Sequence, residues 1–252
     1  MKVLLNEMTW KEAKQYFTKY DIAIVPVGSN EQHGPPNPLG TDHLIARGIA
    51  EEVAKMTGVV CLPTIPFGVS PHHKQFWGTI SVSPRALKRY VKDVCLSLKY
   101  YGVHKIVIVN GHGGNLSTLV EMARELRGEG IFVSVFQWWS AAAELLPNVF
   151  KGDERRHAAA EETSMNLVLN PELVQIKEAV DEKVEKNALF AEGITLALST
   201  VDETASGSFG KTSTASTAKG KRVFKAVVKE LARHVELLKK AKRESLLEKP
   251  KV

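Results

Sequence analysis

The chain has 252 residues, which is enough for one large domain or two small ones with a sizeable hydrophobic core. Hydrophobic residues make up 44% and charged residues 25%, an ordinary balance for a soluble globular protein, and no apolar run reaches the roughly 20 residues of a membrane helix. Much of the basic excess behind the net charge of +6 lies in the C-terminal stretch, among glutamates and apolar residues at helical spacing, which indicates a solvated amphipathic helix rather than a nucleic-acid-binding surface.

The N-terminal residues become charged too early for a secretory signal. The two cysteines, Cys61 and Cys95, lie far apart in apolar stretches and form neither a disulfide framework nor a C-x-x-C metal motif. We therefore expect a cytoplasmic protein with buried thiols, without a membrane or nucleic-acid partner.

Four short, almost wholly apolar runs predict strands at 22–28, 59–63, 105–111 and 131–137. Helical patterns are found at 9–20, 42–57, 84–101, 115–128, 160–169 and 218–244. Strands that are apolar on both faces are typical of a parallel sheet covered by helices on each side. The alternation of strand and helix therefore predicts an α/β fold, with a mainly parallel central sheet in a three-layer α/β/α arrangement, as a single domain over 1–252.

Capping residues mark two of the helix starts: Thr41 and the pair Ser83-Pro84. The segment 202–221 is rich in Ser, Thr and Gly and leads into the last helix. We interpret it as an ordered loop over one face of the molecule, with disorder as the alternative.

The stretch "GSNEQHGPPNPLGTDHLIA" (28–46) follows the first strand and contains three good metal ligands. Glu31 and His33 are two residues apart in an extended context, so their side chains point the same way. Asp42 stands at the start of a helix, where the helix dipole also favours a carboxylate. Taken singly, Glu31 is explained as a solvent-exposed acid and Asp42 as a helix cap.

A second polar segment, "NGHGGN" (110–115), follows the third strand and presents His112 among glycines. Ligands in such folds lie beyond the carboxyl ends of the strands, so both polar segments emerge at the same edge of the sheet. Glu, His, Asp and His form a mixed nitrogen and oxygen set that suits Zn, Mn or Fe(II). A bridging carboxylate would let such a set hold two metals about 3.5–4 Å apart. His112 alone is explained equally well as a loop histidine that bonds to backbone.

A third segment, "RRHAAAEETSMNLVL" (155–169), adds His157, Glu161 and Glu162. If the helix begins at His157, Glu161 lies on its face; if it begins near Ala160, either glutamate can turn inward. The structural alternative is that the two glutamates only stabilise the first turn of the helix.

These segments resemble the signature blocks of the creatininase (creatinine amidohydrolase) family. The blocks are "VPVGSNEQHGPPNPLGTDHLIA", "FWGTISV" (76–82), "IVNGHGGN" and "HAAAEETS", with "GSFGKTSTASTAKG" as the closing glycine-rich block. The resemblance implies a parallel-sheet α/β fold, two divalent metal ions per chain, and a homo-oligomer that is often a hexamer. By the same resemblance, Glu31, Asp42 and His112 bind one metal, His33 and the bridging Asp42 bind the other, and His157 acts in catalysis.

Two positions depart from creatininase proper. That enzyme has a metal-binding glutamate where this chain has Gly114, and Glu162 is the natural substitute ligand. It also has a tryptophan that closes over creatinine where this chain has Asp153, so creatinine itself is a doubtful substrate. Other members of the family remove a formyl group from a pyrimidine intermediate of flavin and deazaflavin synthesis, or trim a peptide precursor of a redox cofactor.

The function predicted from these features is hydrolysis of a linear or cyclic amide C–N bond of a small molecule by water activated between two metals. His157 would pass a proton to the leaving nitrogen, and Glu161 or Glu162 would orient it or accept the proton of the water. Substrate contacts are predicted for His72 (with its neighbour His73), Trp77 of the "FWGTISV" block, Gly113, whose turn offers backbone N–H groups to the oxyanion, and Trp139, which matches a pocket aromatic of the family.

Three alternatives stay open at this point. The chain could be a formamidopyrimidine-nucleotide deformylase, or a metal-binding member of the family that has lost activity, although the presence of His157 counts against the latter. A nucleotide-binding protein with "GHGG" as its phosphate loop is disfavoured, because the chain lacks both G-x-G-x-x-G and the lysine of a P-loop.

Overall fold

The computed structural model describes residues 2–184, 189 and 191–247. Its centre is a four-stranded sheet in the order β2-β1-β3-β4, in which every neighbouring pair is parallel. The strands are β1 (Ile22–Val27), β2 (Val60–Cys61), β3 (Lys105–Asn110) and β4 (Phe132–Gln137). The predicted parallel sheet is thus confirmed. β2 is shorter than its predicted range because Pro63 has no N–H to continue the ladder.

The helices are α1 (Trp10–Lys19), α2 (Thr41–Thr57), α3 (Pro84–Tyr100), α4 (Leu116–Gly128), α5 (Trp138–Leu145), α6 (Ala160–Leu169), α7 (Thr217–Lys240) and α8 (Arg243–Leu246). α5 was not predicted: it follows β4 directly, and no side chain caps it. Ser83 caps α3 with Pro84 behind it, as expected. Thr41 does not cap α2, because Gly40 occupies that position and the Thr41 hydroxyl donates to the Pro38 carbonyl. Among the described residues, no helix combines the length and the apolar character needed to cross a bilayer.

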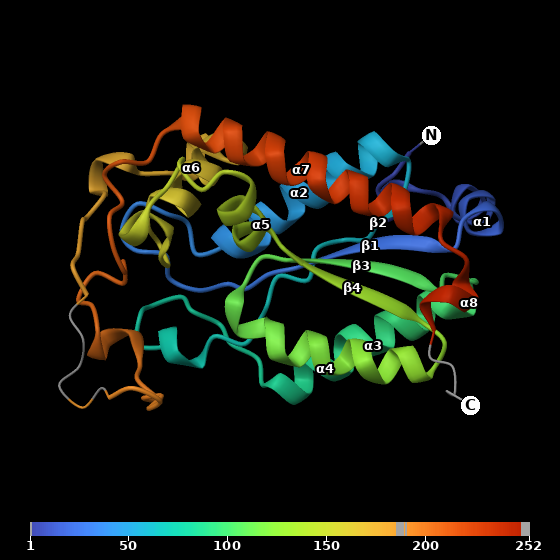
Figure 1. Ribbon diagram of the computed structural model, residues 1–252, viewed down its shortest axis with the longest axis horizontal. Coiled ribbons are helices and arrows are strands. Elements are labelled where there is room, and N and C mark those ends of the chain that lie inside the picture. Colours follow the sequence, from blue (N-terminus) through green and yellow to red (C-terminus); the bar gives the residue numbers. More distant parts are fainter. Residues whose placement is uncertain (1, 185–188, 190, 248–252) are drawn as a thin grey trace.

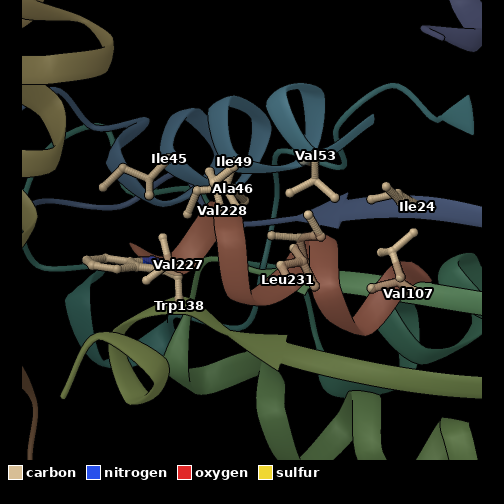
Figure 2. Packing of buried hydrophobic residues seen from close by; sticks show 14 of the residues in the cluster. Ile24, Ile45, Ala46, Ile49, Val53, Val107, Trp138, Val227, Val228 and Leu231 are labelled. Carbon is tan, nitrogen blue, oxygen red and sulfur yellow. The ribbon is translucent and has the colours of Figure 1, made fainter. Parts of the chain in front are cut away.

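Two hydrophobic cores lie on opposite faces of the sheet, which explains why the strands are apolar on both sides (Figure 1). On one face, Ile24 and Val107 of the strands belong to a cluster shared with α2, α5 and α7, which also contains Ile49 of α2 and Leu231 of α7 (Figure 2). On the other face, alternate strand residues pack against α1, α3 and α4. The predicted three-layer α/β/α arrangement follows from this double burial.

Glycines at the ends of β1 and β3 allow the first turn of α2 to lie directly against the sheet. A Cβ at Gly28 would stand 2.3 Å from the Cα of His43, and a Cβ at Gly111 would stand 2.1 Å from the carbonyl oxygen of Asp42. Since real Cβ atoms do not approach other atoms so closely, only glycine fits at either position. This close approach brings Asp42 to the carboxyl ends of β1 and β3, and so determines where the polar residues meet.

Candidate metal centre

Four side chains from the two polar segments 28–46 and 110–115 meet beyond the ends of β1 and β3. His33 Nε2 lies 3.0 Å from Asp42 Oδ1, and His112 Nδ1 lies 3.0 Å from Asp42 Oδ2. The same nitrogen of His112 lies 3.2 Å from Glu31 Oε1. All four residues are buried. The Asp42 carboxylate therefore stands between the two histidines, with one oxygen turned toward each.

Backbone carbonyls fix the orientation of both histidine rings. His33 Nδ1 lies 3.1 Å from the carbonyl oxygen of Glu31, and His112 Nε2 lies 3.0 Å from that of Val69. Because a carbonyl oxygen only accepts, each of these nitrogens carries the hydrogen and donates it. The remaining nitrogen of each ring faces Asp42, and once it has lost its proton it can offer a lone pair to a cation, which is the arrangement that metal-binding histidines adopt.

Several buried polar atoms at this place lack a hydrogen bond: both carboxylate oxygens of Glu31, Nε2 of His33 and Oδ2 of Asp42. Buried atoms of this kind normally find a partner, and the mixed nitrogen and oxygen set suits Zn, Mn or Fe(II). Among the residues that the structure describes, three trios have ligand atoms within 4.8 Å of one another: Glu31, Asp42 and His112; His33, Asp42 and Glu162; and Glu31, His33 and His157. The residues therefore fit a metal centre, and Asp42 belongs to two of the trios.

The carboxylates make the centre attractive to positive charge. Burial alone would lower the pKa of His33, but Asp42, Glu162 and Glu31 raise that pKa to about 10. Burial would also lower the pKa of His112, but the neighbouring carboxylates of Glu31 and Asp42 raise it well above 6.5. The pKa of Glu162 is raised to about 7, chiefly by burial. The negative potential of these carboxylates, which favours protons on the histidines, would also attract a divalent cation.

His157 lies against the centre and is held by Gln32. Its Nε2 is 3.0 Å from the Gln32 carbonyl oxygen and 2.9 Å from the Gln32 side-chain nitrogen, while its Nδ1 is 3.9 Å from Glu31 Oε1. The ring contacts those of His33 and His73, each with centroids 4.4 Å away. Burial, together with His33 and His73, lowers the pKa of His157 well below its usual range. This shift favours the neutral form of the ring, in which one nitrogen has a free lone pair.

The chain reaches α6 through a strained turn directly after His157. The helix begins at Ala160, so His157 precedes it, and Ala158 adopts a left-handed conformation with φ of 58°. The N–H of Ala158 donates to Glu162 Oε2 over 2.6 Å, and this oxygen lies 3.8 Å from His33 Nε2. Glu162 thus holds the strained turn and faces the centre at the same time, which a residue that only caps a helix would not do.

A cavity of about 280 Å³ opens onto the centre. Its lining residues are Asp42, His72, Gly111, His112, Gly113, Gly114, Trp139, Arg155, His157, Glu161 and Glu162. Three of the predicted substrate contacts, His72, Gly113 and Trp139, are thus part of the wall. So are Glu161 and Glu162, which shows that both glutamates turn inward. The pKa of Glu161 is raised to about 7 by burial.

Trp77, the fourth predicted substrate contact, lies elsewhere. Its side chain is 97% exposed and forms no part of the cavity wall. Asp153, which replaces a tryptophan of creatininase, is also outside the wall and pairs with Arg156 over 3.2 Å. At Gly114 a Cβ would stand 2.3 Å from the Val69 carbonyl oxygen and 2.5 Å from His112 Nε2, so a glutamate could not be placed there without a shift of the backbone.

Two residues of the site were not singled out from the sequence. Gln32 lies between two ligands, and its amide nitrogen reaches His157, His73 Nδ1 and the Gly207 carbonyl oxygen over 2.9, 3.0 and 3.1 Å. Arg155 lines the cavity beside Glu161. Gln32 could have been noticed from its place inside the motif. No sequence signal separates Arg155 from Arg156. His73, which was predicted with His72 to line the pocket, is not among the lining residues; it is buried, with Nε2 3.4 Å from Glu31 Oε1.

Comparison with known proteins identifies the family of the chain. The family model described as "Creatininase: Creatinine amidohydrolase" matches residues 6–235. The creatinine amidohydrolase of Pseudomonas putida is 29% identical over 249 residues, covering 91% of this chain and 95% of that protein. The mycofactocin precursor peptide peptidase of Mycolicibacterium smegmatis is 32% identical over 223 residues, covering 86% of this chain and 85% of that protein.

Among solved structures, one described as "Creatininase Mn" superimposes with a TM-score of 0.81 at 28% identity, covering 96% of this chain and all of that one. Another similar structure is described as "Zn-Zn type". More distant relatives include a 2-amino-5-formylamino-6-ribosylaminopyrimidin-4(3H)-one 5'-monophosphate deformylase of Methanothermus fervidus, 29% identical over 65% of this chain. The relatives thus match much of this chain in sequence, while their names give different substrates.

Proposed function

The chain belongs to the creatininase family of hydrolases, and from this premise we propose that it hydrolyses an amide C–N bond of a small molecule at a centre of two divalent cations. The observation that carries the proposal is the position of Asp42. Its two carboxylate oxygens face His33 and His112, each 3.0 Å away, and Asp42 belongs to two of the trios of potential ligands. One bridging carboxylate between two ligand sets is what a dinuclear centre requires.

In this proposal Glu31, Asp42 and His112 hold one cation, and His33, Asp42 and Glu162 hold the other. Bound divalent cations lower the pKa of a coordinated water toward 7 and polarise a carbonyl group. Glu162 replaces the ligand that creatininase proper has at the position of Gly114, where this chain has no room for a side chain.

His157 is the proposed general base and acid. Its neutral ring, with Nδ1 3.9 Å from Glu31 Oε1, can take a proton at the centre and return it to the leaving nitrogen. Gln32 keeps the ring in place through Nε2, which lies 3.0 Å from the Gln32 carbonyl oxygen. Glu161, whose pKa is raised to about 7 by burial, is the second candidate for moving a proton. Gly113 and Gly114 border the cavity, so their backbone N–H groups are candidates for binding the oxyanion.

The volume of the cavity, about 280 Å³, favours a small amide, or the end of a longer substrate, over a whole peptide. Removal of a formyl group, the activity named for the deformylase relative, is the second candidate, since a formamide is among the smallest amides that the cavity could admit. Creatinine is disfavoured, because Asp153 stands outside the cavity in place of a tryptophan. The loss of activity considered above is disfavoured by His157, which borders the same cavity as the proposed ligands.

The proposal is tested by measuring metal content and turnover together. The purified protein should contain close to two divalent ions per chain, and it should hydrolyse at least one member of a panel of creatinine, formamides, small lactams and short peptides with Mn²⁺, Zn²⁺ or Fe²⁺ added. One ion or none per chain would contradict the dinuclear centre, and metal-loaded protein that is inactive on the whole panel would contradict the hydrolysis. Two further proposals are the hexamer, which the family resemblance supports, and the cytoplasmic location, which was predicted from the composition and the early charged residues.

A further inference from the structure

Arg155 is a cationic side chain in the wall of the cavity, and the proposed chemistry does not use it. It belongs to the short 3-10 turn Gly152–Arg155, next to the strained turn that carries His157. Its neighbour Arg156 is about half exposed and pairs with Asp153, whereas the Arg155 side chain is only 19% exposed. The two adjacent arginines therefore have different environments, and only Arg155 borders the cavity.

Two backbone carbonyl groups fix the guanidinium of Arg155. Its Nε donates to the carbonyl oxygen of Phe150 over 2.8 Å, and Nη2 donates to that of Leu146 over 3.0 Å. These two bonds hold the plane of the group in one orientation, so little side-chain entropy is left to lose when a ligand binds.

The third nitrogen of Arg155 has no hydrogen bond. Nη1 is buried, and its nearest anionic atom, Oε1 of Glu161, lies 3.6 Å away, beyond hydrogen-bond distance. Oε1 of Glu161 is likewise buried without a hydrogen bond. Leaving such groups unpaired is costly, and buried donors in native proteins normally have a partner. Both residues line the cavity, and their two unpaired atoms are close enough to attract each other but too far apart for a hydrogen bond.

We propose that the substrate carries an oxyanionic group, a carboxylate or a phosphate, that binds Nη1 of Arg155 while its amide bond lies against the metal centre. A planar guanidinium is the side chain that best matches the paired oxygens of these groups. The entering oxyanion takes the hydrogens that Glu161 does not reach, and Glu161 Oε1 is left to accept from an N–H of the same ligand. This inference rests on the proposed amide hydrolysis and adds the class of substrate to it.

The test uses three propionamide probes that differ only at the far end: succinamate carries a carboxylate, 3-phosphonopropanamide a phosphonate, and succinamide a neutral amide. Calorimetric binding to Mn²⁺-loaded protein should be about tenfold or more tighter for at least one anionic probe than for succinamide, as a charge-assisted hydrogen bond implies. Whichever anionic probe binds more tightly distinguishes a carboxylate substrate from a phosphate substrate.

Variants separate the role of Arg155 from direct binding of the anion to metal. Arg155→Met should abolish the preference for the anionic probe, whereas Arg156→Met, the matched change at the exposed neighbour, should retain it. Glu161→Gln should strengthen binding of the anionic probe, because it removes the negative charge that competes for Arg155. This variant provides the test if Arg155→Met does not fold. Equal binding of all three probes by the wild type, or no binding of any, overturns the inference, as does an unchanged preference in folded Arg155→Met. If the probes show no preference while the amide panel is still hydrolysed, only this inference fails and not the proposed function.

Discussion

A methyl group added at Gly111 should disrupt both the fold and the metal centre. In Gly111→Ala the new Cβ would stand 2.1 Å from the Asp42 carbonyl oxygen and 2.9 Å from its carbon, where ordinary contacts begin at 3.4 Å. The end of β3 and the first turn of α2 must therefore separate by about 1 Å, and overpacking of this kind costs about 1–3 kcal/mol. In a chain of this size the melting temperature should fall by about 2–4 °C for each kcal/mol.

The same separation should weaken metal binding, since it moves the residue that bridges the two proposed sites. Metal–ligand distances tolerate only about 0.2 Å of error. A shift of Asp42 by several times that amount, away from His33 and His112, leaves at least one ligand out of reach. We therefore expect Gly111→Ala to be purified with substantially less metal than the wild type.

The assays are thermal unfolding in the presence of a chelator, which reports the packing cost alone, and elemental analysis of the purified protein. Gly113→Ala is the matched control, because a Cβ at Gly113 has no atom within 4 Å. It should retain the wild-type melting temperature and metal content. If Gly111→Ala has the melting temperature and the metal content of the wild type, the close approach of α2 to the sheet does not position the metal centre.

Further outcomes are expected at three other places. Mn²⁺ at a hundredfold excess over its Kd should raise the free energy of unfolding by about 2.7 kcal/mol for each cation bound, and Asp42→Asn should remove most of this shift; a full shift in the variant would exclude Asp42 as a ligand. His157→Gln should keep the wild-type metal content and lower kcat by about 10²–10⁴-fold, and unchanged kcat would remove His157 from the mechanism. Burial alone would raise the pKa of Glu182, but hydrogen bonds from Ser206, Thr204 and Ala205 lower it to about 2. The stability that Glu182 contributes is thus present above its ordinary pKa of 4.5 and is lost as the pH falls through 2. The melting temperature of Glu182→Gln should therefore lie below that of the wild type at pH 7 and approach it in acid, whereas a constant difference would contradict the lowered pKa.

The helices and strands could be predicted because apolar residues recur at the buried positions of each element with a regular period. Strands that are apolar on both faces need helices on both sides, and the structure has them. The convergence of Glu31, Asp42 and His112 could be predicted for a related reason, since the polar segments follow parallel neighbours whose carboxyl ends share one edge. The resemblance to the creatininase blocks added the roles of the residues, which pattern alone does not give.

Other features could not be predicted because they depend on where irregular segments turn. Trp77 belongs to a signature block and yet is almost wholly exposed, while Gln32, between two ligands, reaches back to His157. The helix α5 had no capping signal and forms because Trp138 packs into the core.

The sequence by itself determined the layers of the fold and the edge of the sheet at which the ligands gather, since both follow from the periodicity of apolar residues and from the order of strands and helices. Only the tertiary structure decided which of two adjacent arginines faces the cavity and which glutamate lies beside the histidines. The physical reason is that side-chain direction in loops is determined by the positions of neighbouring backbone and charged groups, which follow no regular period in the sequence. Arg155 turns inward because the carbonyl groups of Leu146 and Phe150 hold it there, and Arg156 turns outward to Asp153.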